Sequence, residues 1–303
     1  MENFVDRYCE KVAMKESILC VGLDPTIEHV PPKMRSGDAV ADIERYLFNV
    51  IDIASPMVPV IKPQIAYYSA LGKGGEEMLE RLISYAHSRG LLVILDAKRS
   101  DIGKTMEKYG EEVFERYKVD ACTFVPYLGL TFDPSWIKWL QQGRMVISMI
   151  RTSNPEAVIL QDEELKDGKL VYEYIAWLVA RWNAKVAEKT KGKGSVGGVV
   201  GATWPEETLK CRQIAGDEVF FLIPGYGAQG GGADVAVSGL LNSHGKIMGT
   251  VNNSRGITLY SWWDKIRKRS KEGNPFDLIR AEIQDSNNEL ITAANKLITA
   301  ANI

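Results

Sequence analysis

Eight short runs of aliphatic and β-branched residues recur along the chain, and polar or glycine-rich segments follow them. Runs that are apolar at nearly every position are typical of parallel strands covered on both faces, because a half-exposed strand would alternate apolar and polar residues. We therefore predict eight buried strands. They span residues 18–24, 58–62, 91–98, 119–124, 145–150, 196–202, 219–224 and 246–252.

Helical patterns separate these runs. Leu79, Leu82, Ile83 and Ala86, for example, have the spacing of a helix that lies with one face on a sheet. The tail, residues 275–301, predicts a final amphipathic helix. The other predicted helices span residues 39–54, 75–89, 105–117, 134–142, 170–189, 205–215 and 231–240.

Strands that alternate with helices indicate βα units and a parallel sheet. Eight such units predict a closed (β/α)₈ barrel that forms a single domain over residues 1–303. A doubly wound open sheet is the alternative, but the number of units favours closure. The longest connection, residues 151–195, contains either a functional loop or a tolerated surface insertion.

Charged residues stand at the carboxyl ends of the first three predicted strands. Asp24 ends the first, Lys62 the second, and Asp96 and Lys98 the third. In a (β/α)₈ barrel these ends converge on the face where active sites are built, and the i, i+2 spacing of Asp96 and Lys98 directs both to one side. One Asp–Lys pair alone would indicate a structural ion pair. Four charges at one barrel mouth favour a functional site.

Glycine-rich segments follow the last two predicted strands, IPGYGAQGGGADV after the seventh and VNNSRGIT after the eighth. Main-chain N–H groups exposed by glycine bind phosphate, and these two loops are the customary phosphate site of such barrels. Arg255 would add a bidentate contact. Glycine can also serve only a tight turn, but its place after the seventh strand favours a phosphate site.

Composition narrows the class of protein. The chain has 37 basic and 39 acidic residues and a net charge of −2, which provides no electrostatic footprint for nucleic acid or an anionic membrane. No apolar run approaches the ~18 residues of a membrane span, and the N-terminus lacks the apolar segment of a signal peptide. We expect a cytoplasmic protein.

Cysteine and histidine give little sign of metal or nucleophilic chemistry. The four cysteines include no C-x-x-C pair, and Cys20 and Cys122 lie in apolar runs that predict burial. We interpret all three histidines, His29, His87 and His244, as surface or loop residues. No metal-ligand spacing and no G-x-G-x-x-G after the first strand are present, so we expect neither a metal nor a dinucleotide cofactor.

Seven motifs in order, VGLDP, IKPQIAYY, LDAKRSDIGKT, RTSNP, GATWPEE, IPGYGAQGG and VNNSRGI, resemble the orotidine 5′-phosphate decarboxylase family in its longer bacterial and protozoan branch. The resemblance implies conversion of orotidine 5′-phosphate to UMP and CO₂ without a cofactor, the last step of de novo pyrimidine-nucleotide synthesis. It also implies a homodimer in which Asp101, Ile102 and Thr105 reach into the neighbouring subunit's site.

The resemblance assigns the chemistry to the charged cluster. Lys98 would stabilise the carbanion at C6 of the pyrimidine and then protonate it, with Asp96 and the neighbour's Asp101 flanking its ammonium. Lys62 would balance the acids, and Asp24 would bind the ribose. We expect each charge to be paired with an opposite neighbour, which makes burial tolerable.

The remaining assignments concern binding. Arg255 and the backbone near Gly256 would hold the phosphate, Gln229 would link the phosphate loop to the base-side loop, and Ser153 would contact the pyrimidine. Gln229 as a plain loop residue and Ser153 as a turn former are the alternatives.

Two rival functions stay open. One is a sugar-phosphate decarboxylase or aldolase on the same barrel, although its metal-dependent members have an acid where this chain has Lys62. The other is a non-catalytic phosphate-ligand binder, which would not need the complete charge cluster.

Overall fold

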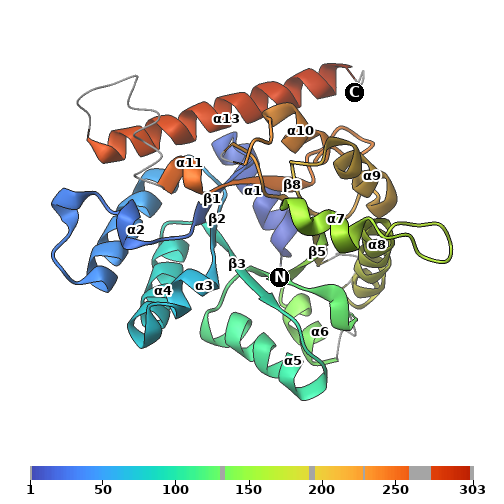
Figure 1. Cartoon of the computed structure of the whole chain (residues 1–303), viewed down its shortest axis with the longest axis horizontal. Helices are drawn as coiled ribbons and strands as arrows, with labels where there is room; N and C mark the ends of the chain where they lie inside the picture. Colours follow the sequence, from blue (N-terminus) through green and yellow to red (C-terminus); the bar gives the residue numbers. More distant parts are fainter. Residues whose placement is uncertain (1, 130–133, 191–194, 228, 259–273, 301–303) are drawn as a thin grey trace.

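Eight parallel strands close into a barrel in chain order, β1 to β8, in the computed structural model (Figure 1). Residues 2–129, 134–190, 195–227, 229–258 and 274–300 are described. The register Cys20↔Asn252 between β1 and β8 closes the sheet, which confirms the predicted (β/α)₈ barrel and excludes the open sheet. The strands are β1 Leu19–Leu23, β2 Val60–Pro63, β3 Leu92–Arg99, β4 Ala121–Phe124, β5 Met145–Arg151, β6 Val196–Val200, β7 Phe221–Ile223 and β8 Gly249–Asn253.

The helices surround the barrel, and the predicted helical ranges agree with them to within a few residues. The largest internal departure is the predicted helix 105–117, which divides into α5 and a π-helical turn, Glu111–Arg116. The helices are α1 Phe4–Lys15, α2 Ala39–Ala54, α3 Ile65–Ser69, α4 Gly72–Ser88, α5 Gly103–Gly110, α6 Pro134–Gln141, α7 Val158–Gln161, α8 Val171–Lys189, α9 Pro205–Ala215, α10 Ala233–Ser238, α11 Arg255–Thr258 and α13 Pro275–Ala300. Short 3₁₀ turns span Ile27–His29, Pro32–Met34, Pro126–Leu128 and Pro155–Ala157.

Helix α1 closes the amino-terminal end of the barrel, a position that the sequence interpretation did not assign. Its Phe4 and Tyr8 make edge-to-face contacts with Phe220, with ring centroids 5.4 and 5.0 Å apart. Both aromatic residues belong to the apolar cluster inside the barrel, together with buried strand residues such as Cys20 and Ile94. The interior is therefore packed at this end, and the functional face lies at the other.

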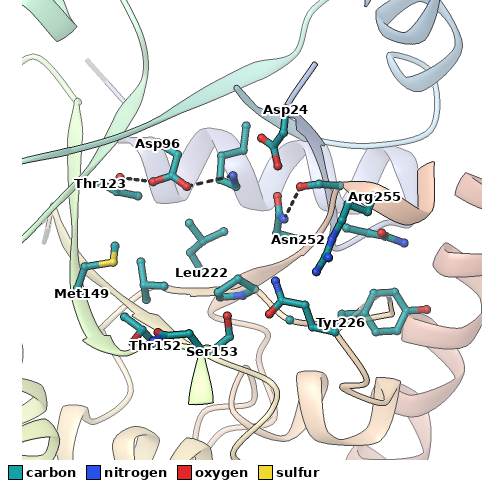
Figure 2. Close-up of a pocket in the computed structure, with 18 of the residues that line it drawn as sticks. Asp24, Asp96, Thr123, Met149, Thr152, Ser153, Leu222, Tyr226, Asn252 and Arg255 are labelled. Carbon is teal, nitrogen blue, oxygen red and sulfur yellow. Dashed lines mark hydrogen bonds and ion pairs between the residues drawn. The ribbon is translucent and has the colours of Figure 1, made fainter. Parts of the chain in front are cut away.

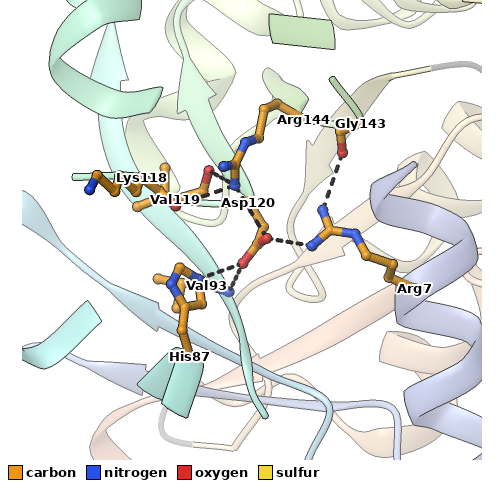
Figure 3. Close-up of polar contacts among 8 residues, drawn as sticks. All are labelled: Arg7, His87, Val93, Lys118, Val119, Asp120, Gly143 and Arg144. Carbon is orange, nitrogen blue, oxygen red and sulfur yellow. Dashed lines mark hydrogen bonds and ion pairs between the residues drawn. The ribbon is translucent and has the colours of Figure 1, made fainter. Parts of the chain in front are cut away.

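Asp120, just before β4, fastens this closed end (Figure 3). Its carboxylate accepts hydrogen bonds from Arg7 Nη1 at 2.6 Å and the Val93 amide at 2.9 Å, and it contacts His87 Nε2 at 2.9 Å. Burial tends to raise the pKa of Asp120, but His87 and Arg7 outweigh it and lower the pKa. His87, interpreted as a surface or loop residue, lies in α4 and not in a loop, and its 32% exposed side chain serves as a polar partner of this buried carboxylate.

Candidate active site

A cavity of about 290 Å³ opens at the carboxyl ends of the strands (Figure 2). Asp24 and Asp96 lie on one side of it, Ser153 on the opposite side, and Arg255 on a third. Asp24, Lys62, Asp96, Lys98, Ser153, Gln229 and Arg255 are the predicted site residues that line it. Residues that span most of the chain thus share one cavity because the parallel strands all end at this face.

Asp96 is the centre of the charged side of the cavity. Its Oδ2 accepts a hydrogen bond from Lys62 Nζ at 3.3 Å, and its Oδ1 accepts one from Lys98 Nζ at 2.7 Å. Thr123 Oγ1, from β4, donates to the same Oδ1 at 2.7 Å. The carboxylate is thereby held between two ammonium groups and a hydroxyl, which fixes its orientation.

These contacts set the charge state of the buried pair. Burial alone would lower the pKa of Lys62, whose side chain is only 6% exposed, but the attraction of Asp96 and Asp24 outweighs it and raises the pKa. Burial likewise tends to raise the pKa of Asp96, yet Lys62 and Lys98 lower it well below its ordinary value. Both groups are charged at neutral pH, and each stabilises the ionised form of the other.

Lys98 has an unusual backbone conformation. Its φ of 46° lies in the left-handed region, and the register of β3 against β4 shifts between Leu95 and Arg99. The predicted contact between Lys98 and Asp96 therefore arises at a β-bulge and not from regular strand alternation. Such a conformation costs on the order of 1–3 kcal/mol in a residue with a side chain, and it is concentrated at functional sites. The Lys98 amide donates to Thr123 Oγ1 at 3.1 Å, which holds the bulge.

Asp24 departs from the expectation that every charge is paired. No described residue forms an ion pair with it or hydrogen-bonds its buried Oδ1. Its influence on Lys62 is electrostatic only. A buried acceptor without a donor is rare in native proteins, and this one faces the cavity.

The glycine-rich side of the cavity is built by the ends of β7 and β8. Gly225 and Gly227 have φ values of 96° and 73°, so the turn after β7 requires glycine there. Arg255 opens α11 and forms no ion pair with the described residues, which leaves its guanidinium available to an anion. Gly256, the next residue in the chain, is buried and does not line the cavity.

Ser153 is held in place through its backbone and its neighbours. Thr203 Oγ1 donates to the Ser153 carbonyl at 3.0 Å, and Trp204 Nε1 donates to the Thr152 carbonyl at 2.8 Å. The guanidinium of Arg151, which is fully buried, stacks on Trp204 with 4.2 Å to the ring centroid and contacts Asp162 at 2.9 Å. The first part of the 151–195 connection therefore packs back beneath this loop.

Asp101, Ile102 and Thr105 lie outside the cavity of their own chain. The Ile102 amide donates to Asp101 Oδ1 at 2.8 Å, and the Ile102 side chain is 63% exposed. Thr105 is exposed in the first turn of α5. Their expected role at a neighbouring subunit stays a prediction.

Comparisons with known proteins identify the family. A sequence model described as "Orotidine 5'-phosphate decarboxylase / HUMPS family" matches residues 17–259. The chain belongs to this family. Orotidine 5′-phosphate decarboxylases of Cupriavidus metallidurans and Bordetella pertussis are 42% and 39% identical over 267 and 261 residues, which cover 87% and 85% of this chain and 91% and 90% of theirs.

Solved structures agree with this family. A putative orotidine 5′-phosphate decarboxylase from Streptomyces avermitilis superimposes with a TM-score of 0.79 at 28% identity, covering 97% of each chain. The corresponding putative enzyme from Toxoplasma gondii gives 0.79 at 25% identity, covering 96% of this chain and 98% of its own. The resemblance drawn from the seven motifs is thus confirmed.

Sequence interpretation missed several residues of the cavity. Thr123 interrupts the apolar run of β4, which was the only signal for its contact with Asp96. Asn252 and Asn253 belong to the motif VNNSRGI, but no role was assigned to them. Met149, Val199 and Leu222 form an apolar wall, and in sequence they are indistinguishable from other strand residues.

No cluster of three or more His, Cys, Asp or Glu side chains among the described residues could hold a metal ion. No described helix combines the length and the apolar character that crossing a membrane requires.

Proposed function

We propose that this protein decarboxylates orotidine 5′-phosphate to UMP and CO₂ without a cofactor, as the last step of de novo pyrimidine-nucleotide synthesis. The observation that carries the proposal is the Asp96 carboxylate held between the Lys62 and Lys98 ammonium groups at the mouth of the barrel. Family membership and relatives named for this reaction support it.

Lys98 would act on the reacting carbon. When the bond between C6 and the carboxylate breaks, CO₂ leaves and the electron pair stays on C6. An ammonium fixed beside C6 stabilises that charge most where it develops, and transfer of its proton to C6 completes UMP. Lysine suits both tasks because its ammonium is a compact charge that can release a proton. Its side chain is 45% exposed in the isolated chain, so it is accessible to substrate.

Asp96 and Lys62 would position this ammonium. The carboxylate holds Lys98 Nζ at 2.7 Å, and Lys62 prevents the carboxylate from taking up a proton near neutral pH. Asp96 would also lie close to the departing carboxylate, although positioning and charge stabilisation suffice for the proposal. Asp24, with its unpaired buried oxygen, would accept a hydrogen bond from a ribose hydroxyl.

The opposite end of the cavity would bind the phosphate. Arg255 and the backbone near Gly256 supply a guanidinium and N–H groups at the start of α11. Gln229 would join this end to the loop of Ser153, which would contact the pyrimidine. Phosphate binding supplies energy remote from C6 that can be used to order the site around the reacting atoms.

A homodimer would complete each site. Asp101, Ile102 and Thr105 do not line their own cavity, and exposed apolar residues such as Tyr127 and Leu128 lie on the next connection. An exposed apolar group of this kind favours an interface. The partner's Asp101 side chain would then flank Lys98.

We further propose that residues 1–303 fold as one domain in the cytoplasm.

One of the two rival functions is metal-dependent chemistry on a sugar phosphate. It is separated from the proposed function by following loss of the orotate absorbance of orotidine 5′-phosphate with purified protein, with and without excess EDTA. We expect rapid turnover that EDTA does not change, and a product that co-migrates with UMP. No turnover by folded protein, combined with magnesium-dependent reaction of a sugar phosphate, would reject the proposal.

A further inference from the structure

The C-terminal helix α13 lies beyond the segment that the family model matches, residues 17–259, yet it contacts both loops of the phosphate end. It runs along the outside of the barrel past α2 and α10 (Figure 1). Its Ser286 Oγ accepts a hydrogen bond from Asn253 Nδ2 at 3.3 Å, and its Glu289 Oε2 accepts one from Tyr226 Oη at 2.7 Å.

These two contacts come from one face of the helix. Ser286 and Glu289 are three positions apart, so they lie side by side on the helix surface. Ser286 is 3% exposed and interrupts the apolar stripe of Ile279, Ile283 and Leu290, which are fully buried. A polar group in such a stripe costs free energy unless it is hydrogen-bonded. The hydrogen bond with Asn253 therefore offsets the free-energy cost of burying the Ser286 hydroxyl.

Tyr226 and Asn253 connect α13 to the cavity, because each contacts α13 and also lines the cavity. One lies after β7 and the other at the end of β8. The ring of Tyr226 points away from the cavity toward α13 (Figure 2). It is flanked by Gly225 and Gly227, so it is the side chain that can anchor this turn.

The protonation of Tyr226 suits this arrangement. Burial and the neighbouring Glu289 raise its pKa, while its hydrogen bond with Ser286 acts in the opposite sense. The phenol stays protonated at neutral pH and donates to the carboxylate. The helix thus contacts both loops, Asn253 through Ser286 and Tyr226 through Glu289.

We propose that α13 is a positioning element of the phosphate site, in which Ser286 and Glu289 hold the two phosphate loops through Asn253 and Tyr226. The inference rests on the proposed function of these loops. Fixing both loops before the ligand arrives reduces the ordering that binding must bring about, and so strengthens phosphate binding. At saturating substrate the phosphate is bound and the site around C6 is ordered as in wild type, so the effect should appear in KM and Kd and not in kcat.

The test compares Ser286→Ala, Glu289→Ala and Glu289→Gln with wild type. We expect Ser286→Ala to raise KM for orotidine 5′-phosphate and Kd for UMP about tenfold, while kcat changes less than about threefold. Glu289→Ala should raise KM and Kd less, because the Glu289 carboxylate is exposed and water can replace it as the acceptor for Tyr226. Glu289→Gln keeps an acceptor and should restore most of the affinity. The Kd of uridine, which lacks the phosphate, should not change in any variant.

Asp285→Ala is the matched control, since Asp285 is an exposed carboxylate on the same helix one position before Ser286. An unchanged Kd for UMP in both Ser286→Ala and Glu289→Ala, with a normal wild type, would overturn the inference alone. Equal weakening of UMP and uridine would overturn it as well, because it would indicate general loosening of the barrel. Wild-type protein that neither turns over orotidine 5′-phosphate nor binds UMP would refute the proposed function, and the inference with it.

Discussion

Asp120 is a single buried residue that joins several elements at the end of the barrel opposite the candidate active site. Its carboxylate side chain is 4% exposed and is contacted by Arg7, His87, Arg144 and the Val93 amide. Removing one member of a buried charged network leaves the other charges buried without an opposite partner, which lowers the free energy of unfolding by about 3–5 kcal/mol. The function of this cluster is therefore stability, and its titration provides a direct way to measure it.

Replacing Asp120 with asparagine should lower the free energy of unfolding by about 2–4 kcal/mol at pH 7. The pKa of Asp120 is lowered in the folded state, so its stabilisation is present above the ordinary value of about 3.9 and is lost as the pH falls through the folded pKa. Urea unfolding of both proteins at pH 5 and pH 2.5 measures the difference, which should be smaller at pH 2.5, below the ordinary value. Asp52→Asn, in an exposed pair with Arg89, is the control and should change stability by less than about 1 kcal/mol. A difference that grows from pH 5 to pH 2.5 would contradict the assignment.

At the scale of elements, the strands and most helices were predictable because barrel strands are buried on both faces and read as continuous apolar runs. Helix α1 was not assigned because its position depends on Phe4 and Tyr8 meeting Phe220, which lies more than two hundred residues away in the chain. The π-helical turn at Glu111–Arg116 was not predicted, because π-helix is rare and the apolar spacing there does not distinguish it from a continued α-helix.

The candidate site was predictable in its charges but not in its geometry. Charged residues at the ends of apolar runs signal a barrel mouth, so Asp96, Lys62 and Lys98 could be grouped from sequence. The β-bulge at Lys98 could not, because a lysine at positive φ is held by surrounding contacts such as the one with Thr123. The unpaired state of Asp24 also depends on distances between strands that sequence spacing does not define.

At the scale of the whole molecule, the proposed homodimer would complete each site with a residue of the other chain. The cavity contains Lys98, whereas Asp101 lies outside the cavity of its own chain. In a two-fold dimer each site would then combine Lys98 of one subunit with Asp101 of the other.

Complementation between two inactive variants tests this arrangement. Lys98→Ala and Asp101→Ala homodimers should each be nearly inactive. After mixing under conditions that allow subunit exchange, half of the dimers carry both variants, and one of their two sites is intact. We expect recovery of about a quarter of wild-type activity. Active mixtures would require a shared site, whereas no recovery despite exchange verified by mass spectrometry would place Asp101 in the site of its own chain or outside it.

The most direct measurement of the central claim is kcat of Lys98→Ala for orotidine 5′-phosphate, with Kd for UMP and the thermal unfolding transition measured alongside. If Lys98 stabilises and protonates C6, kcat should fall by at least about a thousandfold in a folded protein that still binds UMP. If kcat stays within about tenfold of wild type, the network of Asp96, Lys62 and Lys98 does not perform the chemistry assigned to it.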